Sequence, residues 1–291
     1  MAIATVQATI NGSTYNLTYD GAADQWTATL TAPGATSYNL AGGYYPVVVT
    51  ATNDAGTQAS TTVQLVVKER VAPVIAILSP SDGAYVTNNR QPIVIDVTDE
   101  AGGSGVDLTT LLVKLDGAAI TDYTTTAITN GYSVTVTPPT MTDGSHTVTV
   151  DIQDHDGNAA TQKSVTFAVD TVPQPLNITS PADGTVTAAP GMTVAGTTND
   201  SASSPVTIAI TLNGVDQGAV TVGSDGAFAK TVTLTEGSNT IVVTATDAAG
   251  QTSTVTRTVT LDTSTPVIQS ATVTPNPVDA GATMIITVVI T

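Results

Sequence analysis

Two nearly identical phrases divide this chain of 291 residues: SPSDG at 79–83 and SPADG at 180–184. A second repeated feature is a polar turn between two alternating segments. The turn glycines are Gly56, Gly157 and Gly250. A proline joint follows each turn, and the joint prolines are Pro73, Pro173 and Pro266. Internal similarity with a period of about 100 residues indicates duplicated domains, because a unit of that size can bury a core of its own.

Apolar residues alternate with polar ones inside each repeat. In HTVTVDI, Val148, Val150 and Ile152 fall on one face of an extended segment, which is typical of a strand with one buried face. Asn-Gly and Asp-Gly pairs recur along the chain and favour tight hairpin turns. The commonest residue is threonine, at 58 of 291, and β-branched residues favour strands over helices. These patterns predict an all-β fold of β-sandwiches.

Three motifs in the repeats resemble bacterial immunoglobulin-like domains. They are Pro-x-Ile-x-x-x-Ser-Pro-x-Asp-Gly at 73–83, Asp-Gly-x-His-Thr-Val at 143–148 and Asp-x-x-Gly-Asn at 154–158. The resemblance covers residues 71–262, whereas residues 1–70 more loosely resemble N-terminal modules of phage virion proteins. Domains of this family occur in tandem on bacterial surface proteins and on phage tail and capsid proteins. The resemblance therefore implies tandem sandwiches but specifies no ligand.

The repeats and the resemblance together predict four segments. Residues 1–70 form a short N-terminal immunoglobulin-like sandwich, 71–171 and 172–264 form two complete sandwiches, and 265–291 begin a further domain. Placed end to end, such sandwiches are expected to form an elongated rod.

The last segment, PVIQSATVTPNPVDAGATMIITVVIT, contains a proline joint and two strands of a sandwich. Ile285, Ile286 and Val288 belong to a strand that is apolar on both faces, so an unpaired edge there would promote aggregation. We expect either that the native chain continues past Thr291 or that another subunit supplies the missing strands.

The net charge of −17, from 24 acidic and seven basic residues, argues against binding to nucleic acid or to an anionic membrane surface. No apolar run is long enough to insert into a membrane. The chain has no cysteine, so no disulfide stabilises a domain. The start MAIATV resembles a native opening without a signal peptide, which favours a protein assembled in the cytosol into a virion.

Residue types that carry out catalysis are few. The two histidines, His146 and His155, have no cysteine or serine arrangement around them, and no glycine-rich phosphate loop precedes a helix. We therefore predict a non-enzymatic protein with no catalytic residues and no required cofactor.

Calcium is the one metal that the sequence suggests. In QDHDGN, Asp154, Asp156 and Asn158 alternate around Gly157 and offer the hard oxygen ligands that calcium prefers. The glutamate that would end an EF-hand loop is absent, and an aspartate-capped β-turn explains the same residues. A second acidic cluster, around GGSGV, is open to the same two interpretations. It comprises Asp96, Asp99, Glu100 and Asp107.

Aromatic residues are concentrated near the start of the chain, and six of the eleven lie within positions 1–70. Trp26 lies on an alternating strand and is expected to be the core aromatic of its sandwich. Tyr38, Tyr44 and Tyr45 flank the loop NLAGG, where they would form either a glycan-binding platform or corner tyrosines that close the sandwich.

The function that these features favour is a structural or adhesive virion component, a tail or capsid accessory protein that projects or spaces a binding element. Its partners would be other virion subunits and bacterial cell-surface glycan. Two alternatives stay open: a stalk segment of a bacterial cell-surface adhesin, and an ancillary module of a secreted polysaccharide-degrading enzyme.

Overall fold

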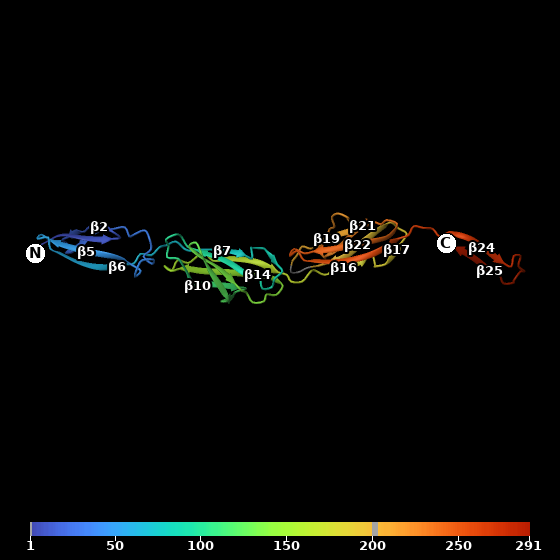
Figure 1. Cartoon of the computed structure of the whole chain (residues 1–291), viewed down its shortest axis with the longest axis horizontal. Coiled ribbons are helices and arrows are strands. Elements are labelled where there is room, and N and C mark those ends of the chain that lie inside the picture. Colours follow the sequence, from blue (N-terminus) through green and yellow to red (C-terminus); the bar gives the residue numbers. More distant parts are fainter. Residues whose placement is uncertain (1, 200–202) are drawn as a thin grey trace. The chain divides into compact units, whose positions relative to one another are not determined.

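The computed structural model describes residues 2–199 and 203–291, and the regular secondary structure of these residues consists of β-strands alone (Figure 1). This confirms the predicted all-β class. Within the described residues no helix is long and apolar enough to span a membrane. The chain separates into two compact units, Met1–Thr171 and Val172–Thr291.

The N-terminal segment, residues 1–70, forms one four-stranded antiparallel sheet, in the order β2-β1-β5-β6, and a separate two-stranded hairpin, β3-β4. The strands are β1 (Ile3–Ile10), β2 (Ser13–Asn16), β3 (Thr18–Asp20), β4 (Gln25–Thr27), β5 (Tyr45–Asn53) and β6 (Gln58–Leu65). Among the described residues of this segment, few apolar side chains are buried: Val6, Ala8 and Tyr45.

Trp26 does not occupy the core position expected for it. It lies on β4 of the small hairpin, is half-buried, and packs against Tyr19 with 5.4 Å between the ring centroids. The prediction was wrong because alternation identifies a strand but not the sheet to which the strand belongs.

Residues 71–171 form a two-layered sandwich. One sheet has the order β11-β10-β14-β15-β8 and the other the order β12-β13-β9-β7. The strands are β7 (Val74–Ser79), β8 (Tyr85–Val86), β9 (Ile93–Thr98), β10 (Val106–Leu115), β11 (Ala118–Ile120), β12 (Tyr123–Ile128), β13 (Gly131–Val136), β14 (Gly144–Asp154) and β15 (Lys163–Val169). The alternating residues of β9, β13 and β14 meet between the layers, and the core includes Ile95, Val134, Val150 and Phe167.

Residues 172–264 repeat this arrangement with sheets in the orders β16-β18-β21 and β17-β23-β22-β19-β20. The strands are β16 (Leu176–Ser180), β17 (Thr185–Thr187), β18 (Gly191–Thr198), β19 (Thr207–Leu212), β20 (Val215–Asp216), β21 (Ala227–Thr233), β22 (Gly237–Thr246) and β23 (Thr252–Leu261). A second, separate core includes Val194, Ile210, Phe228 and Val243.

The strand registers show that the two sandwiches are copies. Leu115 pairs with Val148 where β10 meets β14, and Leu212 pairs with Ile241 where β19 meets β22. In both domains a short strand, β8 or β17, pairs in parallel with the last strand, β15 or β23. The repeated SPxDG phrase lies just before that short strand in each copy.

The final segment contains a hairpin of β24 (Ile268–Thr274) and β25 (Ile285–Ile290). Both strands are exposed along their whole length, including Ile285, Ile286 and Val289. The proline joint and the two strands lie where the sequence predicted the start of a further sandwich.

Candidate functional site

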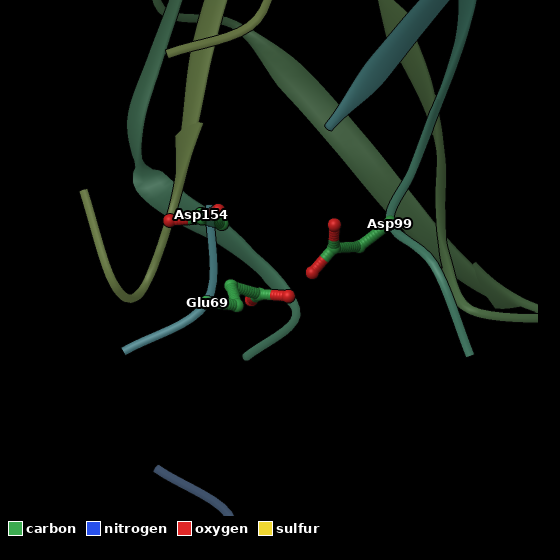
Figure 2. Close-up of side chains that lie close together, drawn as sticks. All are labelled: Glu69, Asp99 and Asp154. Atoms are coloured by element: carbon green, nitrogen blue, oxygen red, sulfur yellow. The ribbon is translucent and has the colours of Figure 1, made fainter. Parts of the chain in front are cut away.

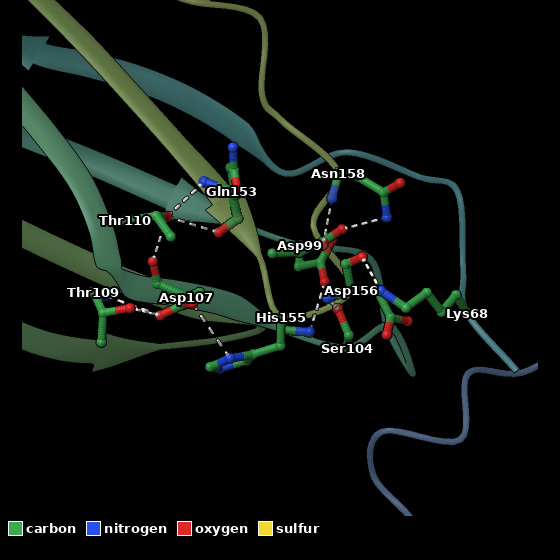
Figure 3. Close-up of polar contacts among 12 residues, drawn as sticks. Lys68, Asp99, Ser104, Asp107, Thr109, Thr110, Gln153, His155, Asp156 and Asn158 are labelled. Atoms are coloured by element: carbon green, nitrogen blue, oxygen red, sulfur yellow. Dashed lines mark hydrogen bonds and ion pairs between the residues drawn. The ribbon is translucent and has the colours of Figure 1, made fainter. Parts of the chain in front are cut away.

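Within the first compact unit, acidic loops of the second domain (residues 71–171) contact the N-terminal segment (residues 1–70). Asp156 is the centre of these contacts. Its Oδ2 accepts hydrogen bonds from Thr36 Oγ1 at 2.6 Å and from the backbone N–H of Glu69 at 3.0 Å. Its carbonyl oxygen accepts one from Lys68 Nζ at 2.9 Å (Figure 3). A single turn residue therefore holds two separate pieces of the N-terminal segment against the second domain.

His155 adds an aromatic contact to the same end of the domain. The ring of Tyr38 stacks on its imidazole with 4.5 Å between centroids and 9° between planes. Nδ1 of His155 lies 3.9 Å from Asp107 Oδ2 (Figure 3). The Thr109 hydroxyl and N–H, aided by the histidine, hold the pKa of Asp107 below its ordinary value.

The three residues predicted to bind calcium fall into two roles. Asn158 donates from its backbone N–H to Asp154 Oδ1 at 2.8 Å and from Nδ2 to Asp154 Oδ2 at 2.7 Å, which is the aspartate-capped turn that the sequence left open. Asp156 holds the N-terminal segment. The carboxylates that come together are instead Glu69, Asp99 and Asp154, each with an oxygen within 4.8 Å of the others (Figure 2).

Sequence reasoning therefore identified Asp154 and placed Asp99 in a second cluster, but it missed Glu69. Glu69 lies in the linker after β6, and no local motif surrounds it. A sequence feature that recurs before each proline joint could have identified Glu69. An acidic residue precedes each proline joint by three or four positions: Glu69, Asp170 and Asp262.

The carboxylates at this junction repel one another. Two like charges 4.8 Å apart cost about 3 kcal/mol at an effective dielectric constant of ~20. Glu100 lies beside them, and the close Glu69 carboxylate, to which only a protonated Glu100 could donate, together with burial and the proximity of Asp99, raises the pKa of Glu100 to about 7. Within the described residues no lysine or arginine forms an ion pair with these groups.

The three tyrosines proposed as a glycan platform do not form one surface. Tyr45 is only 5% exposed and donates its hydroxyl to the carbonyl of Ala35 at 3.2 Å, so its ring is packed inside the N-terminal segment. Tyr38 is exposed and stacked on His155. Tyr44 lines a hollow of ≈ 450 Å³ beside Leu40. Of the predicted platform, Tyr38 and Tyr44 offer partly exposed rings, and burial excludes Tyr45.

A larger hollow, of ≈ 610 Å³, lies in the second domain beside Met141 and His146. His146 is bonded at both ring nitrogens, to Asp116 Oδ2 and to the carbonyl oxygen of Thr142, each at 2.7 Å. Both partners are acceptors, so the charged, doubly protonated ring fits the geometry. Burial opposes this charge, but the two acceptors outweigh it and raise the pKa of His146.

In the third domain (residues 172–264), two uncharged residues replace the pair of Asp116 and His146. This domain therefore serves as an internal control for a prediction about pH. Asn213 and Asn239 occupy the positions of Asp116 and His146, and they bond each other at 3.1 Å. Because the pKa of His146 is raised on folding, its contribution to stability is complete below pH ~6.5 and is lost as pH rises through the folded pKa.

We therefore expect the melting temperature of residues 71–171 to fall as the pH rises above about 6.5, beyond any change in residues 172–264. Calorimetry across this range, with hydrogen exchange to assign the transitions, measures the effect. His146→Asn should flatten the slope of the second domain. An unchanged slope in that variant would assign the pH dependence to other groups.

Comparison with known proteins gives two family matches. Residues 73–150 match the family described as "Bacterial Ig domain", and residues 173–263 match "Glucodextranase, domain B". No curated protein sequence matches the chain.

Solved structures that are similar include fibronectin(III)-like modules of Clostridium thermocellum CbhA, at 14% identity, 64% coverage of this chain, 93% of that chain and a TM-score of 0.40. Sidekick-1 immunoglobulin domains 1–4 match at 14% identity, 88% and 67% coverage and a TM-score of 0.39. The glycan-bound protein SGBP-B of Bacteroides ovatus matches at 18% identity, 92% and 62% coverage and a TM-score of 0.24. The two family matches support immunoglobulin-like domains in tandem, with residues 73–150 matching the bacterial Ig domain family and residues 173–263 matching domain B of glucodextranase.

Proposed function

We propose that this chain is a non-enzymatic spacer, most specifically a tail or capsid accessory component of a bacteriophage virion, which holds a binding element away from the particle. Its partners would be other virion subunits and bacterial cell-surface glycan. The alternative is a stalk segment of a bacterial cell-surface adhesin, which would also hold a binding element at a distance.

The observation that carries this proposal is the junction around Asp156. A spacer transmits position only if successive domains are held to one another, and here Thr36, Lys68 and the backbone of Glu69 all donate hydrogen bonds to one residue of the next domain. Asn39 Nδ2 adds a bond to the carbonyl of Gly103 at 2.6 Å. Four bonds from two chain segments restrict bending at the junction more than a single covalent linker does.

A second candidate function is an ancillary module of a secreted polysaccharide-degrading enzyme. The match of residues 173–263 to glucodextranase domain B favours it. In this setting Tyr38 and Tyr44 would stack on sugar rings, since both remain partly exposed.

Antibodies raised against residues 71–264 distinguish these functions in the organism that produces the protein. We expect gold-labelled antibody to bind intact, purified virions, and the full-length chain to co-migrate with particles through density-gradient centrifugation. Virions from which the gene has been deleted provide the control for antibody specificity.

Labelling of the cell envelope in the absence of particles would replace the virion role with the adhesin stalk. Recovery in the culture supernatant, joined to a catalytic domain, would favour the ancillary module.

A further inference from the structure

The junction between the N-terminal segment and the second domain contains a group of carboxylates, and a spacer role alone does not explain why they lie so close together. We propose that Glu69, Asp99 and Asp154 bind one calcium ion. Their oxygens lie within 4.8 Å of one another, so an ion at their centre lies no more than about 2.8 Å from each, close to the calcium–oxygen distances of about 2.3–2.6 Å. Figure 2 shows the carboxylates of Glu69 and Asp99 pointing toward each other.

Asp99 supplies evidence that does not depend on the count of acidic residues. It is only 7% exposed, and its Oδ1 has no hydrogen-bond partner. Oε2 of Glu69 is likewise buried without one. A buried carboxylate oxygen that lacks a donor is strongly unfavourable, and native proteins rarely leave one in that state. These oxygens require a partner other than the protein's own donors: a cation, a proton or an enclosed water.

A proton satisfies only part of this requirement. Glu100 is the neighbouring acid, and its own Oε2 is also buried without a partner. A protonated carboxyl group has a single O–H to donate, so it can serve one of the acceptor oxygens of Glu69 and Asp99 but not both. A divalent cation serves all of them at once and also offsets the repulsion among the charges.

The backbone of the loop after β9 orients the carboxylates. Gly105 N–H donates to Asp99 Oδ2 at 2.7 Å, and Ser104 N–H donates to Glu69 Oε1. One oxygen of each side chain is thereby held by the backbone, while Oδ1 of Asp99 and Oε2 of Glu69 are left without a donor. Asp154 is held through Asn158, and each of its oxygens has a second lone pair for an ion.

Gly103 explains why this loop can close over the group. A Cβ added there would lie 2.7 Å from Asp99 Oδ2 and 2.8 Å from Glu69 Oε2, which is closer than side-chain atoms approach. Only glycine leaves room for the two carboxylates to converge beneath the loop. Gly103 in the GGSG sequence therefore leaves the space that the carboxylates occupy, in addition to making the loop flexible.

The ligand types and their origin favour calcium over other metals. Every donor is a hard oxygen, whereas zinc prefers histidine and cysteine. The ligands come from a linker and from the ends of β9 and β14, an irregular set that suits calcium better than the near-octahedral geometry of magnesium. Because Glu69 precedes the second domain and the other two ligands belong to it, the ion would fix the linker in place.

The test uses the whole chain, stripped with a chelator and titrated with calcium chloride by isothermal calorimetry. We expect one calcium ion to bind through these residues, and a higher melting temperature for residues 1–171 when it does. Magnesium chloride, titrated separately, should bind more weakly. Asp99→Asn and Glu69→Gln should each weaken calcium binding by more than about tenfold, the loss typical of disturbing even a group behind metal ligands.

Two further measurements separate a metal site from a structural role. Asp99→Asn removes one of the repelling charges, so the calcium-free variant should melt at or above the temperature of the calcium-free parent chain. Asp107→Asn removes a charge at the same end of the domain but outside the group, and should bind calcium like the parent. Absence of calcium binding by the parent, or equal affinity in the parent and in the Asp99 and Glu69 variants, would overturn the proposal.

Discussion

Phe167→Ala is expected to destabilise residues 71–171 strongly while residues 172–264 keep their stability. Phe167 is 1% exposed and packs in the centre of the second domain's core. Removing a buried phenylalanine side chain costs about 3–5 kcal/mol, because the lost transfer free energy adds to the cost of the cavity. Since a domain is typically stable by about 5–15 kcal/mol, this is a large fraction of the total.

Hydrogen exchange followed by mass spectrometry gives the result for each domain separately. The N-terminal segment should lose protection together with the second domain, because it buries few apolar side chains of its own and is held through Asp156. The third domain offers the matched variant, Phe228→Ala, which should destabilise residues 172–264 and leave 71–171 unchanged. Loss of protection in both domains from either variant would contradict independent folding.

The fold was predictable from the sequence because both of its signals are local. Alternation in β14 places Val148, Val150 and Ile152 on one face, and all three are buried in the structure. The repeated SPxDG phrase marks the same place in both sandwiches, just before the parallel strands β8 and β17. The pairing of strands across a sheet is not local, and Trp26 shows the limit, since its strand joined a small separate hairpin.

The candidate site was only partly predictable for the same reason. Asp154 belongs to a turn motif, and Asp99 lies in an acidic loop, so each could be found from its neighbours. Glu69 is distant from both of them along the chain and lies outside the second domain. Only folding of the linker against that domain brings the three carboxylates together. Likewise Tyr44 and Tyr45 are adjacent in sequence and line the same hollow, yet Tyr44 is partly exposed and Tyr45 is buried.

Asn239→Ala is expected to destabilise the third domain by on the order of 3 kcal/mol, although it removes only a small polar side chain. Asn239 is fully buried at the start of β22. Its Oδ1 accepts hydrogen bonds from Asn213 Nδ2 and from the N–H and hydroxyl of Thr235. Its Nδ2 donates to the carbonyl oxygens of Thr235 and Gly237.

The size of this effect follows from what the substitution leaves behind. Alanine neither accepts nor donates, so the groups that Asn239 bonded lose their protein partner and must find water through an opened loop, which costs more than a typical hydrogen bond contributes. Urea denaturation with hydrogen exchange in residues 172–264 measures the loss. Ser238→Ala, at the exposed neighbouring position, should change stability by less than about 0.5 kcal/mol. A comparable small change for Asn239→Ala would show that the loop before β22 holds its conformation without this side chain.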